Sequence, residues 1–558
     1  MKPTLASFRL ISALRLRSAL PVAVLMGSAF VGCADESDPA TWVKRLDDVA
    51  KRSESVKRIG QMYEDRMSKA SGDRSNADVA ALAKLASGPL ATTYATAGID
   101  EKTRMEIIKL LADIQDPSAL PAFNKALAIG GNATPEELRD AARGITAIAK
   151  AGGTIPADVA DALWARFAAS KPSQLKSIQA VRALTEAVVA VKAPSYAPKA
   201  AAMLRLPMTD DPNDKADVLQ YAQQTAAHVL GELKSPEGAR ALVACLLDPK
   251  KGAVAPTFVA TLRKTPDASE LALVGALTGS DAEFLAMSSA LPSGEWRSLL
   301  AEALSSISRP AGRDAVISVL DKAATPADRT ALTLTLVNFP PNKASVDAFL
   351  ASYKKIPADA LFGVKNARGT LMTVAPALMD PALVPWLEKE VADAKGDFAD
   401  ELHKAAFYSL FKMMAEEDLA TVGGLVSKFY PDANSTEKKA FDASAAVVNA
   451  AKKDAAAYIK ELTRLAGPEN TLPFGATKAA WMAGIYGNDN TRADLVQAYT
   501  SGKAVTLPTL SAIDHLAPNG DEISAKAIEA VIGKRPGILA IDDAAAKLVD
   551  KLRARKSK

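Results

Sequence analysis

The chain has 558 residues, of which 49% are apolar but only 5% aromatic, so it has ample material for a core. Much of the apolar content is alanine and leucine, which favour helices, and the alternating β-branched and aromatic pattern of strands is missing. The first 33 residues hold four basic groups and no acid, and the other 64 of the 68 basic residues balance the 64 acidic ones. The sequence therefore predicts an all-α class. Its neutral body argues against nucleic acid as a partner.

The amino terminus has the pattern of an export signal. A basic stretch is followed by an apolar run over residues 18–31, which is short for a membrane span but typical of a signal peptide. The run ends at Gly32-Cys33, which resembles a bacterial lipobox. The resemblance implies that Cys33 is diacylated and becomes the new amino terminus, with ordinary cleavage after Ala34 as the alternative. The basic residues of this signal are Lys2, Arg9, Arg15 and Arg17.

Lipidation would also determine where the protein resides. Each buried CH₂ group contributes about 0.8 kcal/mol, so that one acyl chain anchors marginally and two anchor stably. The resemblance implies the periplasmic face of the envelope. Because residue 34 is alanine rather than aspartate, we expect the outer membrane rather than the inner one, by analogy with enteric lipoproteins.

Residues 34–100 are expected to form a tether and helical cap. The stretch from Thr41 to Lys69 predicts one charged amphipathic helix, with apolar positions that include Val49. Residues 71–76 form a polar break, and another helix is predicted from Asp78 to Leu90.

Residues 101–558 contain a repeating pattern. Five windows of 21 residues align without gaps, each with proline at its eleventh position. Apolar residues before the proline share one helix face, and those after it mark a second helix. Each window therefore predicts a helix, a tight turn and another helix, with the proline ending one helix or beginning the next. The five windows begin at Ile107, Ala226, Leu300, Thr330 and Leu371, and their prolines are Pro117, Pro236, Pro310, Pro340 and Pro381.

Weaker copies fill the intervals and bring the total to about a dozen helix pairs. Double glycines and prolines are expected at helix ends, among them Gly130-Gly131, Gly152-Gly153 and Gly423-Gly424. The weaker copies are residues 143–167, 183–204, 408–428, 445–465, 479–499 and 509–531.

The window from Ala226 to Leu246 resembles the bacterial HEAT repeat, through its Leu-Gly-Glu-Leu core and the following Pro and Ala-x-x-Ala-Leu. The resemblance extends over roughly residues 100–550. It implies a right-handed α-α superhelix of HEAT or armadillo type whose concave surface binds proteins or peptides. Tetratricopeptide arrays are a further alternative, but their 34-residue period and aromatic positions are missing.

Residues suited to catalysis or metal binding are sparse. The three histidines are far apart in sequence, and we expect structural or surface roles for them. No zinc-ligand spacing, phosphate-binding loop or nucleophile motif is present, so no catalytic, cofactor or metal site is predicted. Cys245, in an apolar helical run, is expected to be a buried thiol. The histidines are His228, His403 and His515.

The chain ends in a cluster of basic residues. We expect a frayed, solvated tail, with a docking patch for anionic lipid or polymer as the alternative. The cluster comprises Lys551, Arg553, Arg555, Lys556 and Lys558.

These observations favour a non-catalytic scaffold or adaptor held to the membrane by lipid, with a protein or peptide as its partner. Two alternatives remain open at the level of sequence. One is a lyase-like enzyme, or an enzyme subunit, built on a HEAT array; the other is a passive structural protein of the envelope.

Overall fold

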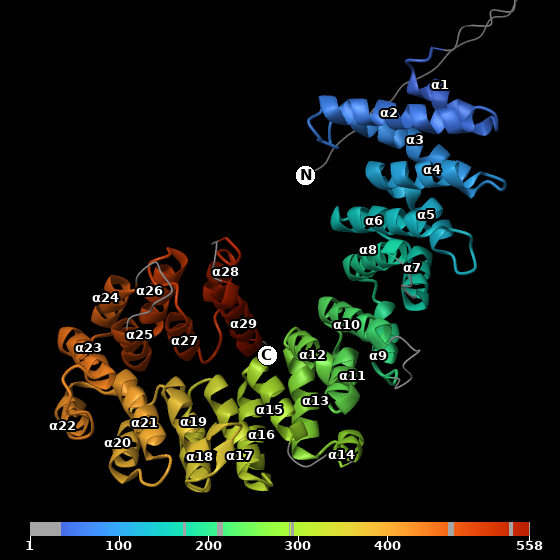
Figure 1. The fold of residues 1–558 in the computed structure, drawn as a ribbon. Coiled ribbons are helices and arrows are strands. Elements are labelled where there is room, and N and C mark those ends of the chain that lie inside the picture. The colour runs from blue at the N-terminus through green and yellow to red at the C-terminus, as the bar shows by residue number, and fades with distance from the viewer. Residues whose placement is uncertain are drawn as a thin grey trace, which may run out of the picture.

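The computed structural model describes residues 35–170, 175–208, 216–289, 291, 295–466, 474–534 and 539–556. In these ranges almost all regular structure is helical, and one short antiparallel hairpin is the exception. The all-α class predicted from composition is therefore confirmed. Figure 1 shows the helices stacked in succession along a curved path. The right-handed twist and the HEAT-type assignment stay predictions.

The first eleven helices form an elongated arm, in which neighbours along the chain pack together (Figure 1). Their bounds are α1 Pro39–Lys44, α2 Arg52–Lys69, α3 Ala77–Ala95, α4 Glu101–Ile114, α5 Leu120–Leu127, α6 Pro135–Lys150, α7 Ala157–Ala169, α8 Leu175–Val191, α9 Tyr196–Leu204, α10 Ala216–Leu233 and α11 Pro236–Leu246.

The remaining helices form what we call the ring. Its first part comprises α12 Ala255–Leu262, α13 Pro266–Thr278, α14 Ala282–Ser288, α15 Glu295–Ile307, α16 Pro310–Val319, α17 Pro326–Thr335, α18 Lys343–Lys354, β1 Leu361–Phe362, β2 Lys365–Asn366, α19 Ala367–Val374 and α20 Leu383–Asp393. Its second part comprises α21 Ala399–Met413, α22 Leu419–Phe429, α23 Thr436–Ala451, α24 Ala455–Leu465, α25 Phe474–Tyr486, α26 Asp489–Thr500, α27 Leu507–His515, α28 Glu522–Glu529 and α29 Leu539–Lys556.

Short 3₁₀ turns join several of these helices, and the two strands pair in register, with Leu361 opposite Asn366. The turns are η1 Arg45–Asp47, η2 Pro117–Ala119, η3 Pro249–Val254, η4 Leu320–Lys322, η5 Leu336–Asn338, η6 Ala375–Leu378 and η7 Glu416–Asp418.

The ring is closed by packing between helices that are distant in sequence. Helix α15 packs against α17, which is followed in turn by α19, α21, α25, α27 and α29, and α29 packs back against α15. Figure 1 shows the red carboxyl-terminal helix lying beside the green helices α12 and α15. The array therefore returns to its own middle instead of continuing as an open solenoid.

Local sequence signals account for many helix ends. Thr134 and Glu137 form a reciprocal capping box at the start of α6, which satisfies two backbone donors. Pro236 and Pro310 occupy the first position of α11 and α16, where the missing N–H has no helical partner to lose. Ser308, which follows α15, adopts the left-handed region at φ +61° and ends that helix.

The predicted helix–turn–helix units are present throughout. Among the strong windows, the one from Ile107 becomes the end of α4, a turn with η2, and α5. The weaker windows do the same: residues 143–167 cover the second half of α6, a turn and most of α7, and residues 509–531 cover most of α27, a turn and α28. The helical period thus located the units along the chain correctly.

Two local predictions are wrong. The helix predicted from Thr41 to Lys69 is interrupted, because Asp48 is extended and its carboxylate accepts the N–H of Ala50 in place of a helical turn. Gly423-Gly424 lies inside α22 and does not end a helix. A Cβ at Gly423 would lie 3.1 Å from the Phe441 ring, so this glycine permits close packing of α22 on α23.

The buried side chains form two hydrophobic clusters. The larger runs from Trp42 in α1 to Phe441 in α23 and also includes Ala554 of α29. The smaller is built mainly from α24 to α29. Residues 35–100 thus share a core with the helices that follow them, and the last helix connects the two clusters.

Candidate binding groove

A cavity among the described residues lies where the ring closes. Four helices, α12, α15, α27 and α29, line it together with η5, and its volume is about 790 Å³. Each helix contributes residues three, four or seven positions apart, such as Ala255, Val259 and Arg263 at α12. One stripe of each helix therefore faces the cavity. We call this cavity the groove.

The walls of the groove are mainly apolar. A mixed surface, largely hydrophobic with a few polar groups, is typical of ligand sites, and the volume falls within their usual range. The larger apolar residues that line the groove are Val259, Leu299, Val337, Phe339, Leu507, Leu510 and Leu548.

Asp514, which lines the groove, pairs with Arg555, whose side chain is only 1% exposed and is not part of the lining. Its guanidinium donates hydrogen bonds to the carbonyl oxygen and hydroxyl of Ser308, at 3.1 and 2.7 Å, across 247 residues of sequence. On the other side it donates to the carbonyl oxygens of Asp514 and Ala517 and lies 2.7 Å from the Asp514 carboxylate. Arg555 thus holds the ends of α15 and α27 together, and we call it the clasp.

Two further ion pairs and hydrogen bonds cross the same junction. The Lys551 ammonium donates to the Asn338 carbonyl oxygen at 3.2 Å and to Asp514 at 3.4 Å. The Arg263 guanidinium lies 3.8 Å from the Asp550 carboxylate. Burial opposes ionisation of Asp514, but Lys551 and Arg555 outweigh it and lower the pKa of this carboxyl. The junction is therefore strongly polar.

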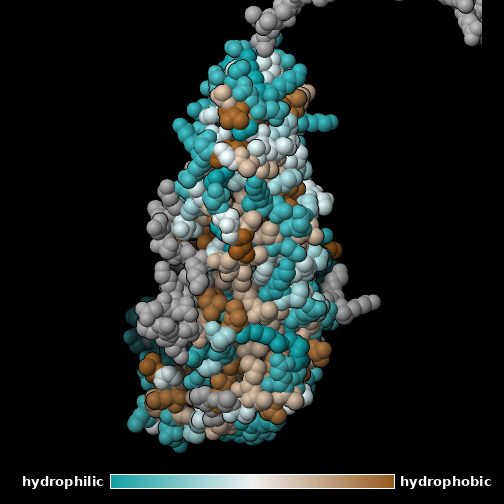
Figure 2. Space-filling model, turned by 90° about the vertical axis from the view of Figure 1, so that its right-hand side faces the viewer, coloured by the Kyte–Doolittle hydropathy of each residue, from teal (hydrophilic) through white to brown (hydrophobic). Residues whose placement is uncertain are grey.

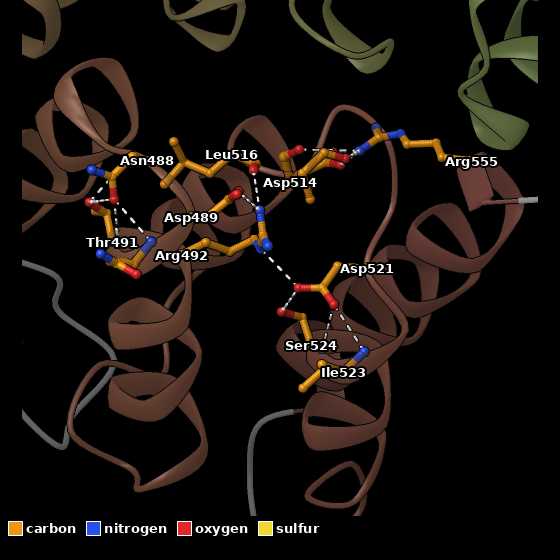
Figure 3. Close-up of polar contacts among 12 residues, drawn as sticks. Asn488, Asp489, Thr491, Arg492, Asp514, Leu516, Asp521, Ile523, Ser524 and Arg555 are labelled. Atoms are coloured by element: carbon orange, nitrogen blue, oxygen red, sulfur yellow. Dashed lines mark hydrogen bonds and ion pairs between the residues drawn. The ribbon is translucent and has the colours of Figure 1, made fainter.

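A second arginine supports α27 from the opposite side (Figure 3). Arg492 of α26 donates to the carbonyl oxygen of Leu516 at 2.7 Å and to the carboxylates of Asp489 and Asp521 at 2.5 and 2.8 Å. Asp521 also accepts hydrogen bonds at the start of α28, from Ser524 among others. Two cations thus bind carbonyl oxygens at the carboxyl end of α27, where the helix dipole is negative.

Ser511, Asp514 and His515 of α27 all line the groove. Burial lowers the pKa of His515 to about 4, so its imidazole is neutral at ordinary pH. Its Nδ1 atom is buried and has no hydrogen-bond partner among the described atoms. Ser511 and His515 both lie in the described part of the chain, and no hydrogen bond joins them. The three residues therefore offer a polar strip to a ligand.

The remaining histidines and Cys245, which stand out in the sequence, do not line the groove and do not lie together. His228 is exposed on α10, and the ring of His403 lies 4.4 Å from that of Phe429 on α22. The prediction of a buried thiol is confirmed for Cys245, which is only 2% exposed, and this burial raises its pKa to about 11. Cys33, the expected lipidation site, lies outside the described residues, as does the rest of the signal.

The frayed-tail interpretation is wrong for the basic cluster up to residue 556. Helix α29 extends to Lys556, and Lys551, Arg553 and Arg555 are held by acids or carbonyl oxygens from other helices. Tertiary contacts order this segment, and no local signal distinguishes it from a solvated tail. The groove residues of α12 and α15 were likewise missed, because they resemble any other position of an amphipathic helix.

The described residues hold no group of three or more histidine, cysteine or acidic side chains arranged to bind a metal ion. In the same ranges, no helix combines the length and apolar character that a membrane span requires. Figure 2 shows apolar residues scattered among polar ones on the outer side of the arm, without a broad apolar patch on that face.

Comparison of the sequence with known proteins provides no relative. No protein-family model matches the chain, and no curated protein matches it. The function must therefore be argued from the groove and from the sequence patterns themselves.

Proposed function

We propose that this protein is a non-catalytic binding scaffold, anchored by lipid in a bacterial envelope, that holds a segment of a partner protein in the groove. The observation that carries the proposal is the position of the groove. It lies between α12 and α15 from the middle of the chain and α27 and α29 from its end. The groove forms only because the ring closes and brings these helices together. The proposed binding function therefore depends on the closed arrangement.

The shape of the groove favours a chain segment as the ligand. From Ala255 to Arg263 and from Leu507 to His515 the lining spans nine residues, and the eight steps between the first and the last correspond to about 12 Å at the helical rise of 1.5 Å per residue. An extended peptide advances about 3.3 Å per residue, so roughly four residues fit along this length. Apolar walls would bury side chains of such a segment, and His515 and Ser511 offer polar partners.

A photo-crosslinking amino acid at Leu507 tests the site in cells. Leu507 lines the groove and is 50% exposed, whereas Leu271 on α13 is 77% exposed and does not line it. The same substitution at Leu271 is therefore the matched control. We expect a covalent adduct of defined mass from position 507 alone. Identical adducts from both positions, or none from position 507, would contradict the proposal.

The anchor is tested separately through Cys33→Ala. We expect the unmodified chain to partition into the detergent phase and the outer-membrane fraction, and the variant to appear in the soluble envelope fraction. Each acyl CH₂ contributes about 0.8 kcal/mol of membrane affinity, so loss of both acyl chains removes stable anchoring. Unchanged partitioning of the variant would rule out lipidation at this residue.

A further inference from the structure

The charges that line the groove are almost all balanced within the protein. Lys551 pairs with Asp514, and Asp514 also pairs with Arg555. Arg263 lies beside Asp550, and Lys547 pairs with Asp543 one turn away at 3.0 Å. Lys551 and Arg555 share the one carboxylate of Asp514, so this group keeps one net positive charge, but both cations also donate to carbonyl oxygens of the protein.

Glu302 is the exception among the described ionisable groups that line the groove. It lies on α15 between Leu299 and Ser306, is exposed, and its carboxylate has no ion pair or hydrogen bond within the described part of the chain. His515, which also lines the groove, is neutral at ordinary pH and does not compensate it. The groove thus presents one exposed carboxylate without an ion-pair partner among the described residues, beside apolar walls.

We propose that the groove selects a short extended peptide segment that has apolar side chains and one lysine or arginine, the cation of which pairs with Glu302. This inference rests on the proposed binding function and adds the chemistry of the partner. The apolar residues Val259, Leu299 and Leu507, which line the groove and keep exposed surface, receive the apolar side chains, and burial of that surface supplies most of the affinity. The pair with Glu302 supplies the preference among sequences.

A random heptapeptide display library, selected against the full mature protein, tests the preference. We expect apolar peptides enriched in lysine and arginine. Glu302→Lys should reverse the preference toward aspartate and glutamate, and Glu302→Gln should abolish it. Glu295→Lys changes an exposed charge on the same helix without lining the groove, and it should select the same peptides as the unmodified protein.

Synthetic versions of one selected peptide make the test quantitative. Replacing its basic residue by glutamate should weaken binding about fivefold to tenfold in the unmodified protein and strengthen it in Glu302→Lys, since a partly enclosed ion pair contributes on the order of 1 kcal/mol. Fluorescence anisotropy of the labelled peptide measures this change. Both variants retain the fold, because residue 302 is exposed, and circular dichroism checks this.

The outcomes separate the two proposals. Selected peptides without an excess of basic residues, or an unchanged preference in Glu302→Lys, overturn the inference about charge and leave the binding function standing. Failure to select any peptide overturns both. Peptides that still bind after Leu507→Trp, at an exposed position of the lining, narrows the groove also overturn both, because they bind elsewhere.

Discussion

Lys478 on α25 is fully buried, and its ammonium donates hydrogen bonds to the carbonyl oxygens of Lys412 and Met414 at the end of α21. These carbonyls lack helical partners, so the lysine acts as a cap supplied by a neighbouring helix. Burial nevertheless disfavours the charged form and lowers the pKa of Lys478 well below its usual value. The free energy of unfolding should therefore change with pH in the neutral to alkaline range.

We expect the free energy of unfolding to rise with pH above neutrality through Lys478. The unfolded lysine keeps its proton up to about pH 10, whereas the folded one loses it earlier, so the unfolded state binds more protons and the slope is positive. The gain is at most about 1.4 kcal/mol per pH unit. Urea unfolding at pH 7, 8 and 9 should show a smaller slope for Lys478→Met, while Lys439→Met, at an exposed site, should match the unmodified protein.

His515 should make the free energy of unfolding depend on pH in the acidic range. Burial lowers its pKa from 6.5 to about 4, so between pH 6.5 and pH 4 the unfolded state binds a proton at this residue and the folded state does not. This contribution is complete above pH 6.5 and is lost as pH falls to 4, with a total of at most about 3 kcal/mol. His515→Asn should therefore lose less stability than the unmodified protein between pH 7 and pH 4.5. Equal losses in urea titrations at the two pH values would refute this explanation.

At the scale of one element, α29 shows how a polar segment is held in a folded position. Arg555 is enclosed by carbonyl oxygens from α15 and α27, whereas Arg553 pairs with Glu522 and Glu529 at partly exposed positions. Removing one partner of a buried pair leaves the other charge and the carbonyls unsatisfied, but an exposed pair contributes little.

The two arginines therefore provide a matched pair of substitutions. Arg555→Ala should destabilise the ring by about 3–5 kcal/mol, and Arg553→Ala by less than about 1 kcal/mol. Hydrogen exchange followed by mass spectrometry should show faster exchange in α27 and α29 only for Arg555→Ala. Similar exchange in both variants would mean that the clasp does not hold the junction.

At the scale of the whole molecule, closure of the ring depends on a small and largely polar junction. The packing of α29 on α15 is supplemented by Arg555, by Lys551 with Asn338, and by Arg263 with Asp550. The rest of the ring is held by apolar packing within the two hydrophobic clusters. We therefore expect the junction to be the place where the ring opens.

Spin labels at Val364 and Leu539, which are 94% and 85% exposed, allow this to be measured across the ring. The unmodified protein should give one narrow distance distribution in double electron–electron resonance. The double variant Lys551→Ala/Arg555→Ala should give a broader distribution shifted to longer distances, because buried cation contacts no longer join the ends. Lys547→Ala, which removes an exposed pair, should leave the distribution unchanged. A narrow, unshifted distribution in the double variant would show that apolar packing alone closes the ring.

The sequence by itself determined the helical units. Apolar spacing, prolines and capping residues act over a few positions, so the helix pairs at residues 143–167 and 509–531 could be located without tertiary information. The same reasoning failed at Asp48, where a side chain competed with the helix, and at Gly423, where a neighbouring aromatic ring required a small residue.

Only the tertiary structure decided the groove and its clasp. Small rotations between successive helix pairs accumulate until α29 meets α15, and no local pattern encodes that sum. The contact between Arg555 and Ser308 spans 247 residues. From sequence alone the basic end of the chain therefore resembles a solvated tail, because the carbonyl oxygens that accept its hydrogen bonds belong to distant segments. Glu302 likewise resembles any exposed residue of a helix. It gains a distinct role because the other charged residues that line the groove already have ion-pair partners within the protein. Those pairs depend on the closed ring and not on the sequence around Glu302.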